Sequence, residues 1–258
     1  MSGHSRWSKV KHYKGTIDAK RGKIFSKLGK QISVACKHGG GDPGFNPRLR
    51  TILMQARAAS MPVDNIERAI KKGTGELPGV TYEEFTYEGY APGGIALLID
   101  ILTDNKNRAA AEIRAIFTKW GGNMAGAGAV KHLFHRKGHI LVAKDAIGED
   151  ELMNLVLDAG AEDMTLQDDA YEILTDPHQF EVVHKALEAK GIKPQSAEVT
   201  YLPITPVPVN DEKTAKAVLN IVEALEDNDD VQNVYASFDI PNAIVEKIQA
   251  AAAAAALL

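Results

Sequence analysis

The spacing of hydrophobic residues changes near residue 80, and this change constrains the fold more than any other feature of the chain. Before it, apolar residues recur at the spacing of one side of an α-helix. After it, the segments 82–90 and 95–103 have the pattern of β-strands, and further strands alternate with shorter helical stretches. We therefore expect an α+β protein whose first part is helical.

The first part contains three predicted helices. The helix over 17–38 has an apolar side formed by Ile17, Ile24, Phe25, Leu28, Ile32, Ala35 and Cys36. Its opposite side is a lysine stripe that we expect to face solvent, formed by Lys20, Lys23, Lys27, Lys30 and Lys37. Asn46-Pro47 supplies an N-cap and a first-turn proline for the second helix, and the third begins near Pro62 and ends at Gly73.

The second part is predicted to contain two α+β units. Strands over 82–90 and 95–103 form a hairpin, followed by a helix that ends near Trp120 and a strand over 130–135. Residues 138–202 then show the β-α-β-β-α-β order of a ferredoxin-like module. The helix over 211–226 and the strand over 231–238 cannot form a domain alone, so we expect them to join the strands that precede residue 138.

This reasoning predicts an N-terminal three-helix domain followed by two α+β (ferredoxin-like) domains, one of which is inserted into the other. The expected boundaries are 1–80 for the basic helical domain, 81–137 plus 203–240 for the discontinuous domain, 138–202 for the inserted domain, and 241–258 for a low-complexity tail.

Charge is distributed very unevenly along the chain. Residues 1–75 contain 16 Lys and Arg against 4 Asp and Glu, a balance of +12, whereas residues 76–258 have a balance of −16. A basic module joined to an acidic body predicts a polyanionic partner for the basic end, and nucleic acid is the usual one. The alternative is a basic surface that only contacts solvent.

Other features narrow the class of protein. The single Cys36 excludes a disulfide framework, no apolar run is long enough for a membrane helix, and residues 1–7 lack the apolar core of a secretory signal. We expect a cytoplasmic protein with no membrane partner, and the oligomeric state stays open.

The segment 4–14 is the strongest candidate for direct contact with nucleic acid. Cations alternate there with Trp7 and Tyr13, a combination that suits phosphate contacts and stacking on bases. The alternatives are a disordered arm, or a Trp7 that packs into the helical core. With the lysine stripe, the predicted nucleic-acid-binding residues are His4, Arg6, Trp7, Lys9, Lys11, His12, Tyr13, Lys14, Lys20, Lys23, Lys27, Lys30 and Lys37.

Motifs for other chemistry are weak. Asp104 and Asn105 lie at a strand-to-helix junction, where capping is their commonest role. His132 and His135 are three apart on a predicted strand and so should face opposite sides, and we expect no metal and no cofactor. The acidic segment 226–230 lacks the pattern of a calcium loop and is predicted to be a solvated turn. No catalytic residues are predicted, and we expect no enzyme activity.

Several strings in the first half of the chain resemble the YebC/PmpR family. They are Gly3-His4-Ser5-Arg6-Trp7 with Lys11-His12, Asp18 to Phe25, Met61-Pro62, Asn65 to Gly73, Tyr87 to Gly94, and Leu102 to Arg108. The resemblance implies a cytoplasmic three-domain protein without known catalytic activity. It also implies the role of a DNA-binding transcriptional regulator, although mitochondrial relatives are translational activators and bacterial members act with the ribosome at proline tracts.

These observations leave three hypotheses. The chain is a DNA-binding regulator, a translation factor that binds the ribosome through ribosomal RNA, or an enzyme that acts on nucleic acid. The third is the weakest, because no catalytic constellation is evident. Aromatic residues among the cations favour RNA, whereas the family label favours DNA.

Overall fold

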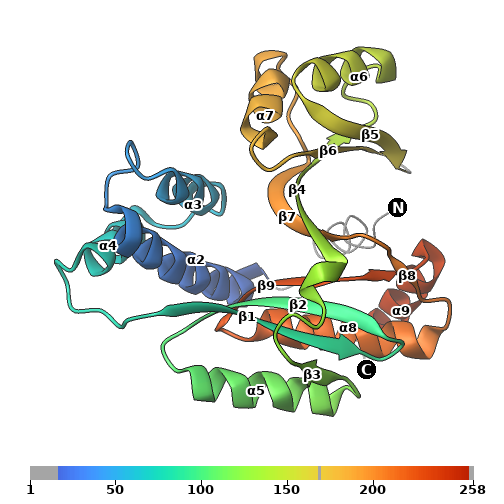
Figure 1. Ribbon diagram of the computed structural model, residues 1–258, viewed down its shortest axis with the longest axis horizontal. Helices are drawn as coiled ribbons and strands as arrows, with labels where there is room; N and C mark the ends of the chain where they lie inside the picture. Colours follow the sequence, from blue (N-terminus) through green and yellow to red (C-terminus); the bar gives the residue numbers. More distant parts are fainter. Residues whose placement is uncertain (1–16, 168–169, 256–258) are drawn as a thin grey trace.

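The computed structural model describes residues 17–167 and 170–255, which form a helical unit and two sheet-containing units (Figure 1). The helical unit lies beside the central unit, and the inserted unit projects from it on a two-stranded stalk. This arrangement confirms the predicted fold class.

The helical unit contains α2 (Ile17–Gly39), α3 (Pro47–Ala58) and α4 (Val63–Thr74). Asn46 caps α3 as predicted, because its side chain accepts a hydrogen bond from the Leu49 amide. The predicted end of the third helix at Gly73 was wrong. That helix continues to Thr74, and Gly75 supplies the left-handed residue, with φ of 86°. Gly73 serves packing instead, since a Cβ there would collide with the Ser33 carbonyl oxygen on α2.

The core of the helical unit is separate from the other cores. Its buried members come from all three helices: Leu28, Ile32, Ala35, Cys36, Leu49, Ile52, Leu53, Ala56, Met61, Ile66 and Ala69. Ile24, which we predicted on the apolar side of the first helix, is instead 45% exposed. Among the described side chains of α2, the apolar stripe is packed into the core from Phe25 and Leu28 onward.

The central unit is built from two segments of the chain. The first contributes β1 (Glu83–Ala91), β2 (Ile95–Thr103), α5 (Lys106–Lys119) and β3 (Asn123–Ala125). The second contributes β8 (Val207–Pro208), α8 (Glu212–Asp227), β9 (Val231–Ala236), β10 (Phe238–Asp239) and α9 (Asn242–Ala255). The main sheet is antiparallel with the order β3-β1-β2-β9, and α5 and α8 pack on one face of it.

Two expectations for the central unit were wrong. Residues 130–135 do not form its third strand, because β3 occupies that edge and residues 131–133 form a short 3-10 helix. Residues 241–258 are not simply a tail, since α9 begins at Asn242 and its Val245 is buried in the central core. The sequence could not show either pairing, because both depend on partners far along the chain.

The inserted unit has the predicted ferredoxin-like order. Its elements are β4 (Phe134–Ala143), α6 (Glu149–Asp158), β5 (Ala161–Gln167), β6 (Ala170–Thr175), α7 (Phe180–Ala189) and β7 (Ser196–Pro203). The antiparallel sheet has the order β5-β6-β4-β7. The central sheet, β3-β1-β2-β9, has the same spatial order, with β1 in the position that β6 has in the inserted sheet. Since β1 comes first along the chain and β6 comes third in its unit, the two units are permuted forms of one topology.

The stalk formed by β4 and β7 packs on the second face of the central sheet. Phe134 lies there in a cluster with Leu98, and Tyr201 contacts Tyr235 edge to face with ring centroids 5.1 Å apart. Strand β2 is therefore covered on both faces, as its apolar run 95–102 predicted.

The loop that leads into the stalk is held by the buried carboxylate of Glu88. It accepts hydrogen bonds from the backbone amides of Gly128, Val130 and Lys131, at 2.6, 2.6 and 2.9 Å. Burial opposes the charged form, but these three donors outweigh it, and the pKa of Glu88 lies below its ordinary value.

Candidate nucleic-acid interface

Lys23, Lys27 and Lys30 of α2 contact the central unit, which corrects our expectation that they face only solvent. All three reach across to the end of α8 and the turn that follows it, residues 226–230. Lys23 Nζ donates to the Asp227 carbonyl oxygen at 3.1 Å and lies 3.2 Å from its Oδ1. Lys27 Nζ donates to the Glu226 carbonyl oxygen at 2.6 Å.

Lys30 makes the most buried of these contacts. Its Nζ donates to the Asp229 carbonyl oxygen at 2.9 Å and to Asp230 Oδ1 at 2.8 Å. The Lys30 and Asp230 side chains are only 14% and 5% exposed, whereas those of Lys23 and Asp227 are 45% and 65% exposed. The predicted solvated turn is therefore one side of a contact between the helical and central units.

Asp230 connects this contact to the core of the central unit. Its Oδ2 accepts hydrogen bonds from Thr103 Oγ1 at 2.7 Å and from Arg108 Nη2 at 2.8 Å. Burial raises the pKa of Asp230, but Lys30, Arg108 and Thr103 donate to the carboxylate and bring its pKa below the ordinary value. Hydrogen bonds that Arg108 donates to Asp230 and Asp104 raise the pKa of Arg108, which stays a cation.

The junction that contains Asp104 and Asn105 has the capping role that we predicted. The Asn105 side chain caps α5 by accepting from the Arg108 amide at 3.0 Å. Asp104 pairs with the Arg108 side chain one turn later. These residues stabilise a helix start and hold the arginine that faces Asp230.

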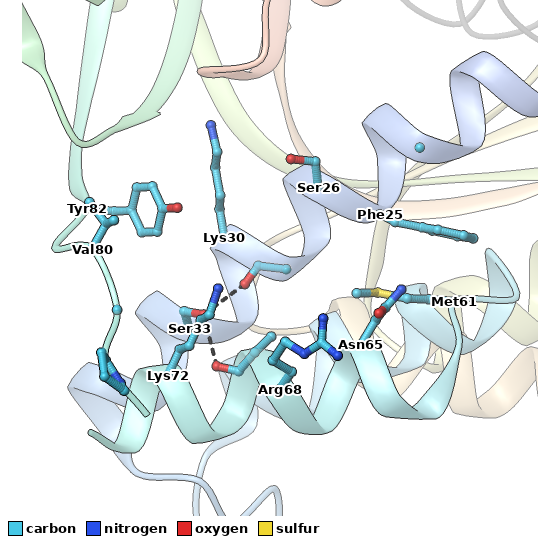
Figure 2. A pocket seen from close by; sticks show the side chains of 15 residues that line it. Phe25, Ser26, Lys30, Ser33, Met61, Asn65, Arg68, Lys72, Val80 and Tyr82 are labelled. Carbon is cyan, nitrogen blue, oxygen red and sulfur yellow. Dashed lines mark hydrogen bonds between the residues drawn. The ribbon is translucent and has the colours of Figure 1, made fainter. Parts of the chain in front are cut away.

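A groove of about 750 Å³ lies between α2, α4 and the segment that leads into β1 (Figure 2). Phe25 and Met61 line one end, and Val80 and Tyr82 line the other. From α4, Asn65, Arg68 and Lys72 point into the groove towards α2.

Two contacts hold α2 and α4 together along the floor of this groove. Ser33 Oγ hydrogen-bonds the Gly29 carbonyl oxygen in its own helix and the Ala69 carbonyl oxygen of α4, at 3.0 and 2.9 Å. The close approach at Gly73 needs a residue without a Cβ. The spacing of the groove walls is therefore set by the packing of α2 on α4.

Arg68 and Lys72 are exposed, and within residues 17–167 and 170–255 neither forms an ion pair. Tyr82 is half-buried and lies under Lys30, whose Nζ is 5.7 Å from the ring centroid. The groove thus combines unneutralised cations with aromatic surface, which is the combination that binds phosphates and unpaired bases.

A second basic surface lies on α3. That helix carries three arginines and no acidic residue, and Arg50 and Arg57 are exposed on it. Arg48, by contrast, pairs with Glu84 at the start of β1. Our sequence reasoning missed these arginines and the groove cations. The absence of acidic residues between 47 and 58 was the signal that could have identified the arginines, whereas nothing local indicates that Arg68 and Lys72 face α2.

The remaining predicted site residues divide into three groups. Lys37 is exposed near the end of α2, apart from the groove. Lys20 belongs to α2, but its side chain lies outside the described part. His4, Arg6, Trp7, Lys9, Lys11, His12, Tyr13 and Lys14 lie outside the described residues. Their roles stay predictions.

Within the part of the chain that the structure describes, no cluster of three or more His, Cys, Asp or Glu side chains is arranged to hold a metal ion. His132 lies in the 3-10 helix and His135 on β4, so the predicted strand does not hold both. None of the helices in the described ranges is both long and apolar enough to cross a membrane.

Comparison with known proteins gives full-length matches. Residues 5–76 match the family model for the TACO1/YebC protein N-terminal domain, and residues 82–238 match that for the TACO1/YebC second and third domain. A probable transcriptional regulatory protein of Syntrophobacter fumaroxidans is 54% identical, over 96% of this chain and 100% of its own length. One of Dictyoglomus turgidum is 53% identical over the same shares.

A solved structure is also similar. The crystal structure of a conserved hypothetical protein from Aquifex aeolicus superposes with a TM-score of 0.81 at 48% identity. The match covers 92% of this chain and 98% of the other.

Proposed function

This chain belongs to the TACO1/YebC family, and on that premise we propose that it is a non-enzymatic regulator of gene expression that binds nucleic acid through its helical unit. Its curated relatives are named probable transcriptional regulatory proteins, which supports a regulatory role. The groove between α2 and α4 carries the proposal for binding, because Arg68 and Lys72 face Phe25 and Tyr82 across it.

The chemistry of this groove favours an unpaired strand over a duplex. Bases in a duplex are stacked and present only their edges, whereas a single strand offers flat faces to aromatic rings and phosphates to nearby cations. Single-stranded segments are common in ribosomal RNA. We therefore propose RNA of the ribosome as the ligand, with the alternative of an operator in DNA decided by the test below.

The residues named from the sequence enter this proposal in two ways. The segment 4–14 is proposed to extend the groove's binding surface with cations, Trp7 and Tyr13. The lysines of α2 are proposed to contact phosphate as well, although Lys23, Lys27 and Lys30 are occupied by the turn 226–230 in this structure.

The test reverses the groove charges with the variant Arg68→Glu/Lys72→Glu. The matched control is Lys144→Glu/Lys193→Glu, which shifts net charge equally. It changes two exposed lysines of the inserted unit that form no ion pair within the described ranges. Affinity for a labelled single-stranded RNA, measured by fluorescence anisotropy, should fall at least about tenfold in the groove variant. The slope of log affinity against log salt should also decrease by about 1.4 for two lost phosphate contacts.

Equal affinities of the two variants would contradict binding in the groove. The class of nucleic acid is tested by sedimentation of cell lysate, where the wild-type chain should travel with ribosomes and lose this association after RNase treatment. Binding to one DNA sequence about 10³-fold more tightly than to random duplex, without ribosome association, would instead establish the DNA alternative.

A further inference from the structure

The turn 226–230 occupies lysines that are spaced to bind a phosphate backbone. Lys23, Lys27 and Lys30 lie four and then three positions apart, so they project from one side of α2. Each ammonium group contacts carbonyl or carboxylate oxygens of the turn at 2.6 to 3.2 Å. Phosphate oxygens accept the same hydrogen bonds from lysine.

The negative partner is the carboxyl end of a helix as well as an acidic segment. The Glu226 and Asp227 carbonyl groups belong to the last turn of α8, where carbonyls lack partners within the helix and the helix dipole is negative. Carboxylates at Asp227, Asp229 and Asp230 add to this field. The end of α8 therefore occupies the α2 lysines in place of an external anion.

Little apolar surface holds this contact closed. The buried cores of the helical and central units share no residue. Besides the lysine contacts, α2 meets β9 through a hydrogen bond between Gln31 and Gln232. A polar contact of this kind can separate without exposing a hydrophobic core, and the exposed pair between Lys23 and Asp227 is open to screening by salt.

The chain also has a place where it can bend. Residues 75–82 connect α4 to β1; residues 75–81 are all exposed and include Gly75 and Pro78-Gly79. The groove ends at this segment, and Ser26, Lys30 and Tyr82 line both the groove and a second cavity that reaches the turn 226–230. A nucleic-acid strand bound in the groove therefore reaches Lys30, which also contacts the turn 226–230.

We propose that the turn 226–230 is an internal phosphate mimic that holds the lysine row of α2 closed, and that nucleic acid displaces it and releases the helical unit from the central unit. This proposal rests on the function proposed above. Displacement follows because the lysines bind phosphate only in the open state, so the ligand has a higher affinity for that state and shifts the equilibrium towards it. Because part of the binding free energy is used to open the contact, the apparent affinity of the closed protein for nucleic acid is lower than that of the open state.

The first test weakens the mimic and leaves the lysines intact. In the variant Asp227→Asn/Asp229→Asn two exposed carboxylates lose their charge, while the backbone carbonyl groups stay. The control Asp145→Asn/Asp163→Asn makes the same charge change on exposed residues of the inserted unit. Affinity for the single-stranded RNA should increase at least about fivefold in the turn variant relative to this control.

The second test measures the separation of the two units. Spin labels are placed on α4 and α8 through Glu67→Cys and Lys216→Cys, both exposed positions, while Cys36 is buried and does not compete for the label. Pulsed electron paramagnetic resonance should show a single distance for the free protein and a longer, broader distribution with RNA. The turn variant should change at lower RNA concentration than the control.

The outcomes separate this proposal from the function on which it rests. RNA binding with an unchanged distance, or equal affinity of the turn variant and its control, would overturn the internal mimic and leave the groove as the binding site. Failure of the wild-type chain to bind either single-stranded RNA or duplex DNA would overturn both.

Discussion

Asp230 is the position where one side chain contributes both to the stability of the central unit and to the docking of the helical unit. Its carboxylate accepts from Lys30 across the contact and from Thr103 and Arg108 within the central unit. We predict that Asp230→Ala destabilises the protein by about 3–5 kcal/mol, because it leaves the largely buried Lys30 ammonium and the buried Thr103 hydroxyl without this acceptor.

A double-mutant cycle isolates the part that crosses the contact. Lys30→Met keeps most of the aliphatic stem and removes the charge, so the cycle with Asp230→Asn should give a coupling energy of about 1.5–3 kcal/mol. The same cycle for Lys23→Met and Asp227→Asn should give about 0.2–1 kcal/mol, because both of those side chains are largely exposed. Urea denaturation followed by circular dichroism measures all the variants at one salt concentration.

The pH dependence has a definite sign. Because the pKa of Asp230 is lowered in the folded state, its stabilising contribution is present above the unfolded value, about 3.9, and is lost as pH falls through the folded value. The stability difference between wild type and Asp230→Asn should therefore be constant near neutral pH and shrink below about pH 4. Equal coupling energies for the buried and exposed pairs would refute this reasoning.

Two further predictions concern the central unit. Glu88→Gln should lower the free energy of unfolding by about 2–4 kcal/mol, because a carboxamide cannot accept hydrogen bonds from all three amides of the 128–131 loop. Because the pKa of Glu88 is lowered in the folded state, this difference in urea denaturation should diminish only below about pH 4. Gly89→Ala should cost about 1–3 kcal/mol, since its Cβ would lie 2.5 Å from Cζ of the fully buried Phe117, whereas Gly126→Ala has open space and should leave the melting temperature nearly unchanged.

Much of the local structure was predictable from the sequence because its causes are local. Asn46 followed by proline specifies a helix start, since the cap and the fixed proline backbone act within one turn. Asn105 caps α5 for the same reason. The apolar run 95–102 indicated a strand covered on both faces, although it could not show that the stalk strands β4 and β7 provide one of the covers.

The candidate site depended more on tertiary structure. The spacing of Lys23, Lys27 and Lys30 showed that they share one side of α2, and this was correct. What lies opposite that side could not be inferred, because the residues they contact are 199 to 204 positions later in the chain. The groove was also missed, since its walls come from separate helices and the segment before β1.

The sequence by itself determined the helical and sheet-forming segments, the charge imbalance and the family resemblance, because each follows from residue types and spacings within a short window. Only the tertiary structure decided which cations remain available to a ligand. Charge is a property of the residue, but its neutralisation depends on the distance to an opposite charge, and folding alone brings the end of α8 within hydrogen-bonding distance of α2.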